Sequence, residues 1–198
     1  MNREKNYSYF SAMLNEIRSE LKKLSDEKVK GSFRKFVPGS QNVYGVKMPF
    51  VNELAKKYKE GGYALVQALW RSGAFEERVL AAKMLGRIAK KDPGKTLSLI
   101  KQFSKDISDW AVCDTLGMQS PKPINKSHAK EIFTLSNELI RSKNFWQRRL
   151  SLVLSEWYTR DRSFHPQIRT LLAQVKEDDA YYVKKAIVWI NRNFEKKR

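Results

Sequence analysis

The 198-residue chain is long enough for one domain with a sizeable core, and its 41% hydrophobic and 12% aromatic content excludes an intrinsically disordered protein. A formal net charge of +18, from 39 Lys and Arg against 21 Asp and Glu, indicates a polyanionic partner. The sequence has no apolar run near the ~18 residues that a membrane-spanning helix needs, and one cysteine with two histidines cannot build an ordinary zinc cluster.

Composition also indicates which kind of polyanion the protein binds and in which cellular compartment it is found. The start of the chain is polar and lacks a signal-peptide core, and a single cysteine excludes an internal disulfide framework. Both features fit a reducing cytoplasm. The basic residues are spread over several segments and interleaved with aromatics, which favours nucleic acid over an anionic membrane surface. We therefore expect a cytoplasmic protein that binds nucleic acid.

The first part of the chain has the pattern of amphipathic helices. Residues 6–30 are predicted to form one or two of them, because apolar residues recur at helical spacing. Gly31 to Gly45 predicts a break that contains the turn residues Pro38 to Asn42.

A second helical stretch follows this break. The segment Tyr44-Gly45-Val46-Lys47-Met48-Pro49 leads into a new helix with Pro49 in its first turn. That helix is expected to stop at Gly61-Gly62, and another runs from Tyr63 to about Arg71. Because no segment alternates like a strand over a useful length, the chain is predicted to be all-α with short connections.

Four similar blocks recur in the rest of the chain. They begin at Phe75, Asp109, Phe145 and Tyr181, at offsets of 34, 36 and 36 residues, and each opens with a large or aromatic side chain at its first or second position. Another helical stretch precedes each of the last three blocks, namely Thr96–Phe103, Ser127–Ile140 and Pro166–Val175. Helix pairs at this period indicate a HEAT-like α-solenoid, so we expect a single HEAT-like domain over residues 1–198 with a concave basic face.

The second block differs from the other three. Asp114 stands where the others have an apolar residue, and it follows Trp110 by one helical turn, so the ring and the carboxylate share one face. Ser108 or Asp109 is expected to cap this helix, and Gly117 with Pro121 beyond it is expected to end it. The alternative for such a spacing is a buried tryptophan and an aspartate that pairs with a nearby base.

Several motifs together resemble one known family. Trp110-x-x-x-Asp114, Trp146-Gln-Arg-Arg149 and the segment Lys185 to Arg192, together with the entry segment Tyr44 to Pro49, are similar to motifs of the HEAT-like DNA alkylation repair glycosylases of the AlkD type. The motifs occur in the correct order over nearly the whole chain.

The resemblance implies excision of purines made cationic by alkylation at N3 or N7 of double-stranded DNA. By position, Trp110 and Trp189 would flank the lesion and Asp114 would face the deoxyribose. Indole faces attract a cationic base, and a fixed carboxylate stabilises the oxocarbenium ion that forms when the glycosidic bond breaks. The alkylated base is already a good leaving group, so the implied reaction requires no general acid. We expect a monomeric enzyme with no metal and no organic cofactor.

Phosphate contacts are predicted for basic residues within or near the motifs. Arg148, Arg149 and Arg192 are the first candidates, Lys47 comes next, and Lys185 could contribute. The alternative for each of them is a solvated surface charge.

Two other classes of protein remain open at this stage. One is a non-catalytic HEAT-like protein that recognises bent or branched DNA through the same basic groove. The other is a scaffold for an acidic protein. Retention of Trp110, Asp114 and Trp189 together favours the enzyme, because a pure binder needs no aspartate at that position.

Overall fold

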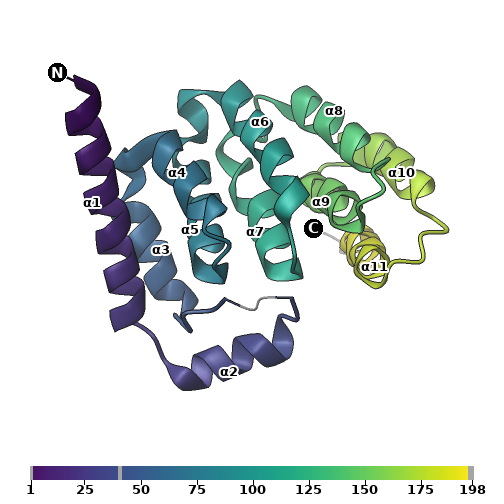
Figure 1. Cartoon of the computed structure of the whole chain (residues 1–198). Helices are drawn as coiled ribbons and strands as arrows, with labels where there is room; N and C mark the ends of the chain where they lie inside the picture. The colour runs from purple at the N-terminus through teal and green to yellow at the C-terminus, as the bar shows by residue number, and fades with distance from the viewer. Residues whose placement is uncertain (1, 40–41, 196–198) are drawn as a thin grey trace. The chain divides into compact units, whose positions relative to one another are not determined.

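The computed structural model describes residues 2–39 and 42–195, and their side chains from Phe10 to Phe194 apart from that gap (Figure 1). The described residues form α-helices and short 3₁₀ turns without a β-strand, which confirms the all-α prediction. None of these helices combines the length and the apolar character needed to cross a membrane. By their contacts the residues divide into two compact units, 1–88 and 89–198, and the single domain stays a prediction.

The first unit is built around its last helix, α5 (Phe75–Ile88), which packs against α3 (Met48–Lys57) and α4 (Gly62–Arg71). Before these come α1 (Asn2–Lys23) and α2 (Glu27–Phe36), and α2 runs across the direction of α1, α3 and α5 (Figure 1). Pro49 lies in the first turn of α3, as its sequence position predicts.

The expected break at Gly31 is wrong, because α2 continues through this glycine to Phe36. Asp26 caps the helix by accepting hydrogen bonds from the backbone N–H groups of Lys28 and Val29. Further along, the Phe33 ring packs on Phe75 at 5.0 Å between centroids. The cap and the packing contact offset the low helix propensity of one glycine.

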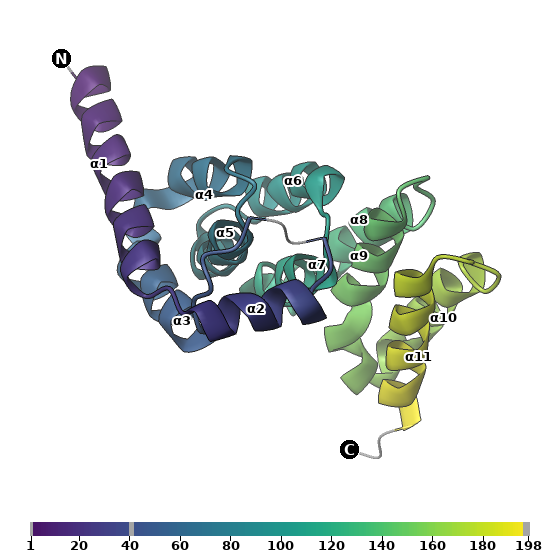
Figure 2. The same cartoon turned by 60° about the horizontal axis from the view of Figure 1, so that its bottom comes forward.

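The described helices of the second unit can be taken in chain order as three sequence pairs, namely α6 (Pro93–Phe103) then α7 (Trp110–Gln119), α8 (Ala129–Leu139) then α9 (Phe145–Ser155), and α10 (His165–Gln174) then α11 (Tyr181–Glu195). Of these pairs, α8 and α9 pack closely on each other. The second helix of each pair starts where a predicted block starts or one residue later. Helix α9 lies between α7 and α11 and contacts both of them (Figures 1 and 2).

The predicted end of α7 at Gly117 is also wrong, because the helix continues to Gln119. A Cβ atom at Gly117 would lie 2.6 Å from Val153 Cγ1 and 3.0 Å from Leu150 Cδ1. The glycine therefore serves close packing of α7 on α9. This contact fixes the register of the two helices that carry the candidate site.

Candidate active site on α7, α9 and α11

The site begins at the N-terminus of α7. Asp109 caps this helix, since its Oδ1 accepts a hydrogen bond of 2.8 Å from the backbone N–H of Val112. The cap fixes the start of the helix at Trp110, so Trp110 and Asp114 share one face a turn apart. Both side chains are half-buried, whereas Cys113 beside them is fully buried. The sequence predicted the cap and the shared face.

Arg149 of α9 holds the Asp114 carboxylate from the neighbouring helix. Its Nε donates to Asp114 Oδ1 at 3.0 Å and its Nη2 donates to Oδ2 at 2.8 Å, which makes a bidentate pair. Its Nη1 donates to the backbone carbonyl of Tyr182 on α11 at 2.7 Å. Arg149, a buried residue that is 6% exposed, thus connects all three helices.

Two opposing effects act on the pKa of Asp114. Burial raises the pKa of this carboxyl above its ordinary value, while the hydrogen bonds and the charge of Arg149 act in the opposite direction. Each carboxylate oxygen gives one lone pair to Arg149 and retains another. A carboxylate with a raised pKa is also a stronger base toward a water molecule than an ordinary aspartate.

Aromatic side chains of α9 and α11 pack together near the Asp114–Arg149 pair. Trp146 of α9 is 8% exposed and stacks on Tyr182 of α11, with ring centroids 4.7 Å apart and an interplanar angle of 27°. Phe145 and Tyr181 extend this cluster to the surface at centroid distances of 4.8 and 5.1 Å. This packing of Trp146 keeps α9 and α11 together beside Arg149.

The third tryptophan of the predicted site lies on α11. Trp189 is half-buried and follows Tyr182 by seven residues, so the two lie on the same side of that helix. The structure thus joins Asp114 to Arg149, and it places Trp110 on the face of Asp114. The role of Trp110 and Trp189 as the two flanks of a base stays a prediction.

The predicted phosphate ligands differ in how their side chains are used. Arg192 and Lys185 are exposed on α11, and Lys185 Nζ lies 5.3 Å from the centre of the Tyr181 ring. Lys47 is exposed at the start of α3, in the unit of residues 1–88. Arg149 is occupied by Asp114, as described above.

Arg148 is also bound within the protein. Its Nε donates to Asp178 Oδ2 at 2.5 Å, its Nη2 donates to Asp178 Oδ1 at 3.1 Å, and its Nη1 donates to the backbone carbonyls of Ser142 and Lys143. These bonds fix the start of α9 to the loop that precedes α11. A contact of Arg148 with phosphate stays a prediction.

Two residues of the site were not predicted from the sequence, Tyr182 and Asp178. Tyr182 supplies the carbonyl and the ring that hold Arg149 and Trp146, and its only signal was an aromatic residue at the second position of its block. Asp178 accepts a hydrogen bond from the Ala180 N–H just before α11, and no sequence pattern indicates its pairing with Arg148. As for metals, the described part of the chain has no group of three or more His, Cys, Asp or Glu side chains that could hold an ion.

The fold and the site together define a basic, all-helical protein in which a half-buried aspartate, one turn from a tryptophan, is held by a buried arginine. The model of the DNA alkylation repair enzyme family matches residues 17–198, so the chain belongs to this family. The match confirms the resemblance found in the motifs and assigns the chain to DNA alkylation repair. A comparison with curated proteins found no match.

Proposed function

We propose that the chain is a monofunctional DNA glycosylase that removes cationic N3- and N7-alkylated purines from duplex DNA by hydrolysis. The observation that carries the proposal is the Asp114 carboxylate, held bidentately by Arg149 one helical turn from Trp110. A carboxylate fixed in this way needs no reorganisation when positive charge develops near it.

The chemistry follows from the charge of the lesion. When the bond between C1′ and the alkylated nitrogen breaks, its electron pair moves to the base, which leaves as a neutral molecule. The positive charge then resides on the sugar as an oxocarbenium ion, which the Asp114 carboxylate stabilises. Water adds to C1′ and loses a proton to Asp114 or to solvent, which gives an abasic site and the free alkylpurine. Because the base leaves neutral, the reaction requires no general acid.

Each neighbouring residue has a defined part in this proposal. The indole rings of Trp110 and Trp189 attract the cationic base, an interaction that is strongest for tryptophan among the aromatic residues. Arg149 orients the carboxylate, and the lone pairs that it leaves can face the sugar and the water. The exposed cations Arg192, Lys185 and Lys47 contact phosphates.

We further propose that the helix pairs of residues 89–198 are HEAT-like repeats. Helices α7, α9 and α11 begin at residues 110, 145 and 181, so the repeat is 35 to 36 residues long. Stacked repeats place equivalent positions of successive blocks side by side. Asp114 and Arg149 are 35 residues apart, one position out of register in the block alignment, so stacking brings neighbouring positions of two successive blocks into one site.

Base release by the wild-type chain tests the proposed function. Duplex DNA that carries 7-methylguanine or 3-methyladenine is incubated with excess protein, and the free base and the abasic site are quantified against undamaged duplex. We expect release of the base from the methylated duplex alone, with one abasic site formed for each base. Tight binding without any release would support instead a non-catalytic protein that recognises bent or branched DNA.

A further inference from the structure

Helix α2 presents a strongly basic face to solvent. Residues 21–36, which include α2, contain six lysines and arginines against two acids. None of the ten residues of α2, all of which the structure describes, is buried. Lys30 pairs with Glu27 at 3.3 Å, while Lys28, Arg34 and Lys35 are exposed. Such a density of exposed cations on one short helix costs self-repulsion in the isolated protein, which a polyanion would relieve.

A glycine lies in the middle of this basic face. Gly31 is three residues from Lys28 and four from Lys35, so all three share one side of the helix. Beyond its chain neighbours and the backbone of its own helix, a Cβ atom at Gly31 would have no heavy atom within 4 Å, and the residue is exposed. Glycine inside a helix costs roughly 0.5–1 kcal/mol relative to alanine. The fold of the chain therefore gives no reason for this glycine.

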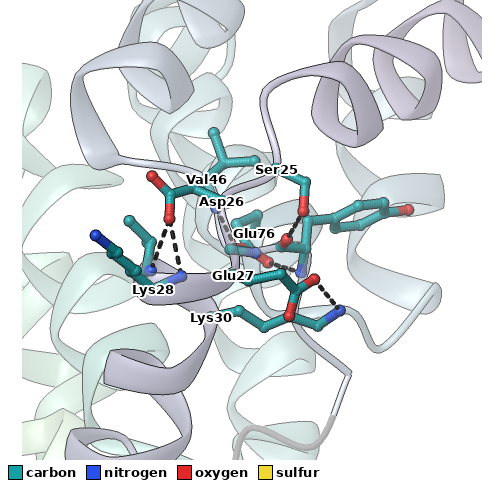
Figure 3. A network of polar contacts seen from close by, with 10 residues as sticks. Ser25, Asp26, Glu27, Lys28, Lys30, Val46 and Glu76 are labelled. Carbon is teal, nitrogen blue, oxygen red and sulfur yellow. Dashed lines mark hydrogen bonds and ion pairs between the residues drawn. The ribbon is translucent and has the colours of Figure 1, made fainter.

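The N-terminal end of α2 is fixed firmly to the rest of its unit (Figure 3). The backbone N–H of Asp26 donates to the Gly45 carbonyl at 3.0 Å. The buried Glu76 carboxylate of α5 in turn accepts the backbone N–H groups of Tyr44, Gly45 and Val46 at 2.9, 2.7 and 2.9 Å. Three hydrogen bonds to a charged group are strong, so the segment that carries α2 is fixed to α5.

Only glycine fits at the centre of this anchor. Gly45 has a φ of +86°, and a Cβ atom there would lie 2.6 Å from the Asp26 carbonyl oxygen. The close approach allows the segment before α3 to lie against the start of α2. The basic face of α2 is thus preorganised and does not have to be ordered when a partner binds.

We propose that the outer face of α2, formed by Lys28, Gly31, Arg34 and Lys35, is a contact surface for the phosphate backbone of duplex DNA. The lysines and the arginine neutralise phosphates, and Gly31 lets the helix backbone approach the DNA closely. An acidic protein is the other polyanion of comparable charge, but the family of the chain acts on DNA. The proposal deepens the proposed DNA binding and rests on it. It adds a contact surface that the unit of residues 1–88 carries by itself.

The test compares charge-removing variants of the full chain. Lys28→Gln with Lys35→Gln removes two cations of the face, and Lys56→Gln with Lys90→Gln removes two exposed lysines elsewhere. Binding to undamaged fluorescent duplex is measured by anisotropy from 50 to 200 mM salt. We expect the α2 pair to lower the slope of log affinity against log salt by about two contacts' worth, roughly 1.8. The control pair should change it much less.

Glycine variants test the close approach separately. Gly31→Ala should raise the melting temperature, because alanine is the better helix residue. Gly31→Gln should weaken DNA binding about fivefold. Gly94→Ala is the matched control, because Gly94 is an exposed glycine in α6, and it should leave DNA affinity unchanged.

The outcomes separate this proposal from the proposed function. If the α2 pair and the control pair have equal slopes, or if Gly31→Gln binds DNA like the wild type, the α2 surface is wrong whatever the enzyme does. Displacement of DNA from α2 by an acidic protein at equal charge concentration would also overturn it. Failure of the wild type to release methylated bases, in contrast, contradicts the glycosylase and leaves the binding result for α2 intact.

Discussion

Arg148 and Arg149, neighbours on α9, each hold an aspartate through two hydrogen bonds, yet the pKa values of the two carboxyl groups are shifted in opposite directions. Burial acts to raise the pKa of Asp178, but the hydrogen bond from Arg148, the N–H of Ala180 and the nearby charges outweigh it and lower that pKa. Asp114 has only Arg149 against the effect of burial, and its pKa is raised. The Asp178 side chain is 5% exposed and that of Asp114 is 20% exposed.

The difference separates a structural ion pair from a candidate catalytic one. Asp178 has donors on both oxygens, including a backbone N–H, and fixes a loop. Arg149 fixes the orientation of Asp114, but fewer hydrogen-bond donors offset the burial of this carboxylate, and a tryptophan shares its helix face. Pairs of titratable groups whose surroundings move their pKa values apart are typical of functional sites. The comparison therefore supports the proposed chemical role of Asp114 and a structural role for Asp178.

The largest expected effect is on the rate of base release. Asp114→Asn should slow it by ~10²–10³, the usual loss for one well-placed electrostatic group, because the stabilisation is realised mainly in the transition state. Asp178→Asn removes the same charge from the adjacent arginine and should leave the rate unchanged. Single-turnover release of 7-methylguanine with protein in excess measures both variants.

Stability is the control for this pair of variants. Each substitution places an amide opposite a guanidinium, and the loss of melting temperature should be larger for Asp178→Asn, because the pKa of Asp178 is lowered on folding whereas that of Asp114 is raised. A thermal melt of each variant fixes an assay temperature at which it is fully folded. Equal slowing of base release by the two variants would show that the Asp114 pair is structural as well.

Much of the fold was predictable because it depends on local signals. The starts of α7, α9 and α11 follow from aromatic residues at a repeat of about 36 residues, and the Asp109 cap follows from its position before Trp110. The errors at Gly31 and Gly117 have one cause. A glycine predicts the end of a helix, whereas the packing of Phe33 on Phe75 and the close approach of Gly117 to Val153 favour helices that continue past the glycine.

The partners of the two arginines were not predictable in the same way. The motif spacing identified Asp114 and Trp110 because both are on one helix. The pairing of Asp114 with Arg149 joins residues 35 positions apart, and that of Arg148 with Asp178 joins residues 30 apart. Successive arginines on a helix point about 100° apart, and which neighbouring helix each one meets depends on packing that the sequence does not display.

The next effect concerns the pH dependence of base release. Burial raises the pKa of Asp114, so this carboxylate takes up a proton at a higher pH than an ordinary aspartate, whose pKa is ~3.9. Release requires the carboxylate, so the wild-type rate should fall about tenfold per pH unit below the raised pKa. After subtraction of uncatalysed depurination, this fall of the rate at low pH should persist in Asp178→Asn and be absent in Asp114→Asn. If the rate falls only at the pKa of an ordinary aspartate, the result contradicts the proposed role of the Asp114 carboxylate.

Unfolding free energy should depend on pH with opposite signs for the two aspartates. The pKa of Asp178 is lowered on folding, so its stabilisation is present above the unfolded pKa of ~3.9 and is lost as pH falls through the folded pKa. The pKa of Asp114 is raised, so its contribution is present below ~3.9 and is lost as pH rises through the folded pKa. Urea unfolding of the wild type and both variants from pH 3 to 8 measures the two differences. If unfolding free energy depends on pH in the same way in the wild type and both variants, the two ion pairs do not differ as proposed.

The smallest expected effect is on DNA binding, and it compares a bound arginine with an exposed one. Arg192→Gln should lower the slope of log affinity against log salt by about 0.9, because an exposed guanidinium on α11 is available to a phosphate. Between 50 and 200 mM salt, one such contact changes the relative affinity only about 3.5-fold. Arg148→Gln should leave the slope unchanged, because its guanidinium already binds Asp178 and two carbonyls. If Arg148→Gln flattens the slope as much as Arg192→Gln while the protein stays folded, Arg148 exchanges Asp178 for a phosphate when DNA binds, and its pair is then part of the DNA-binding surface.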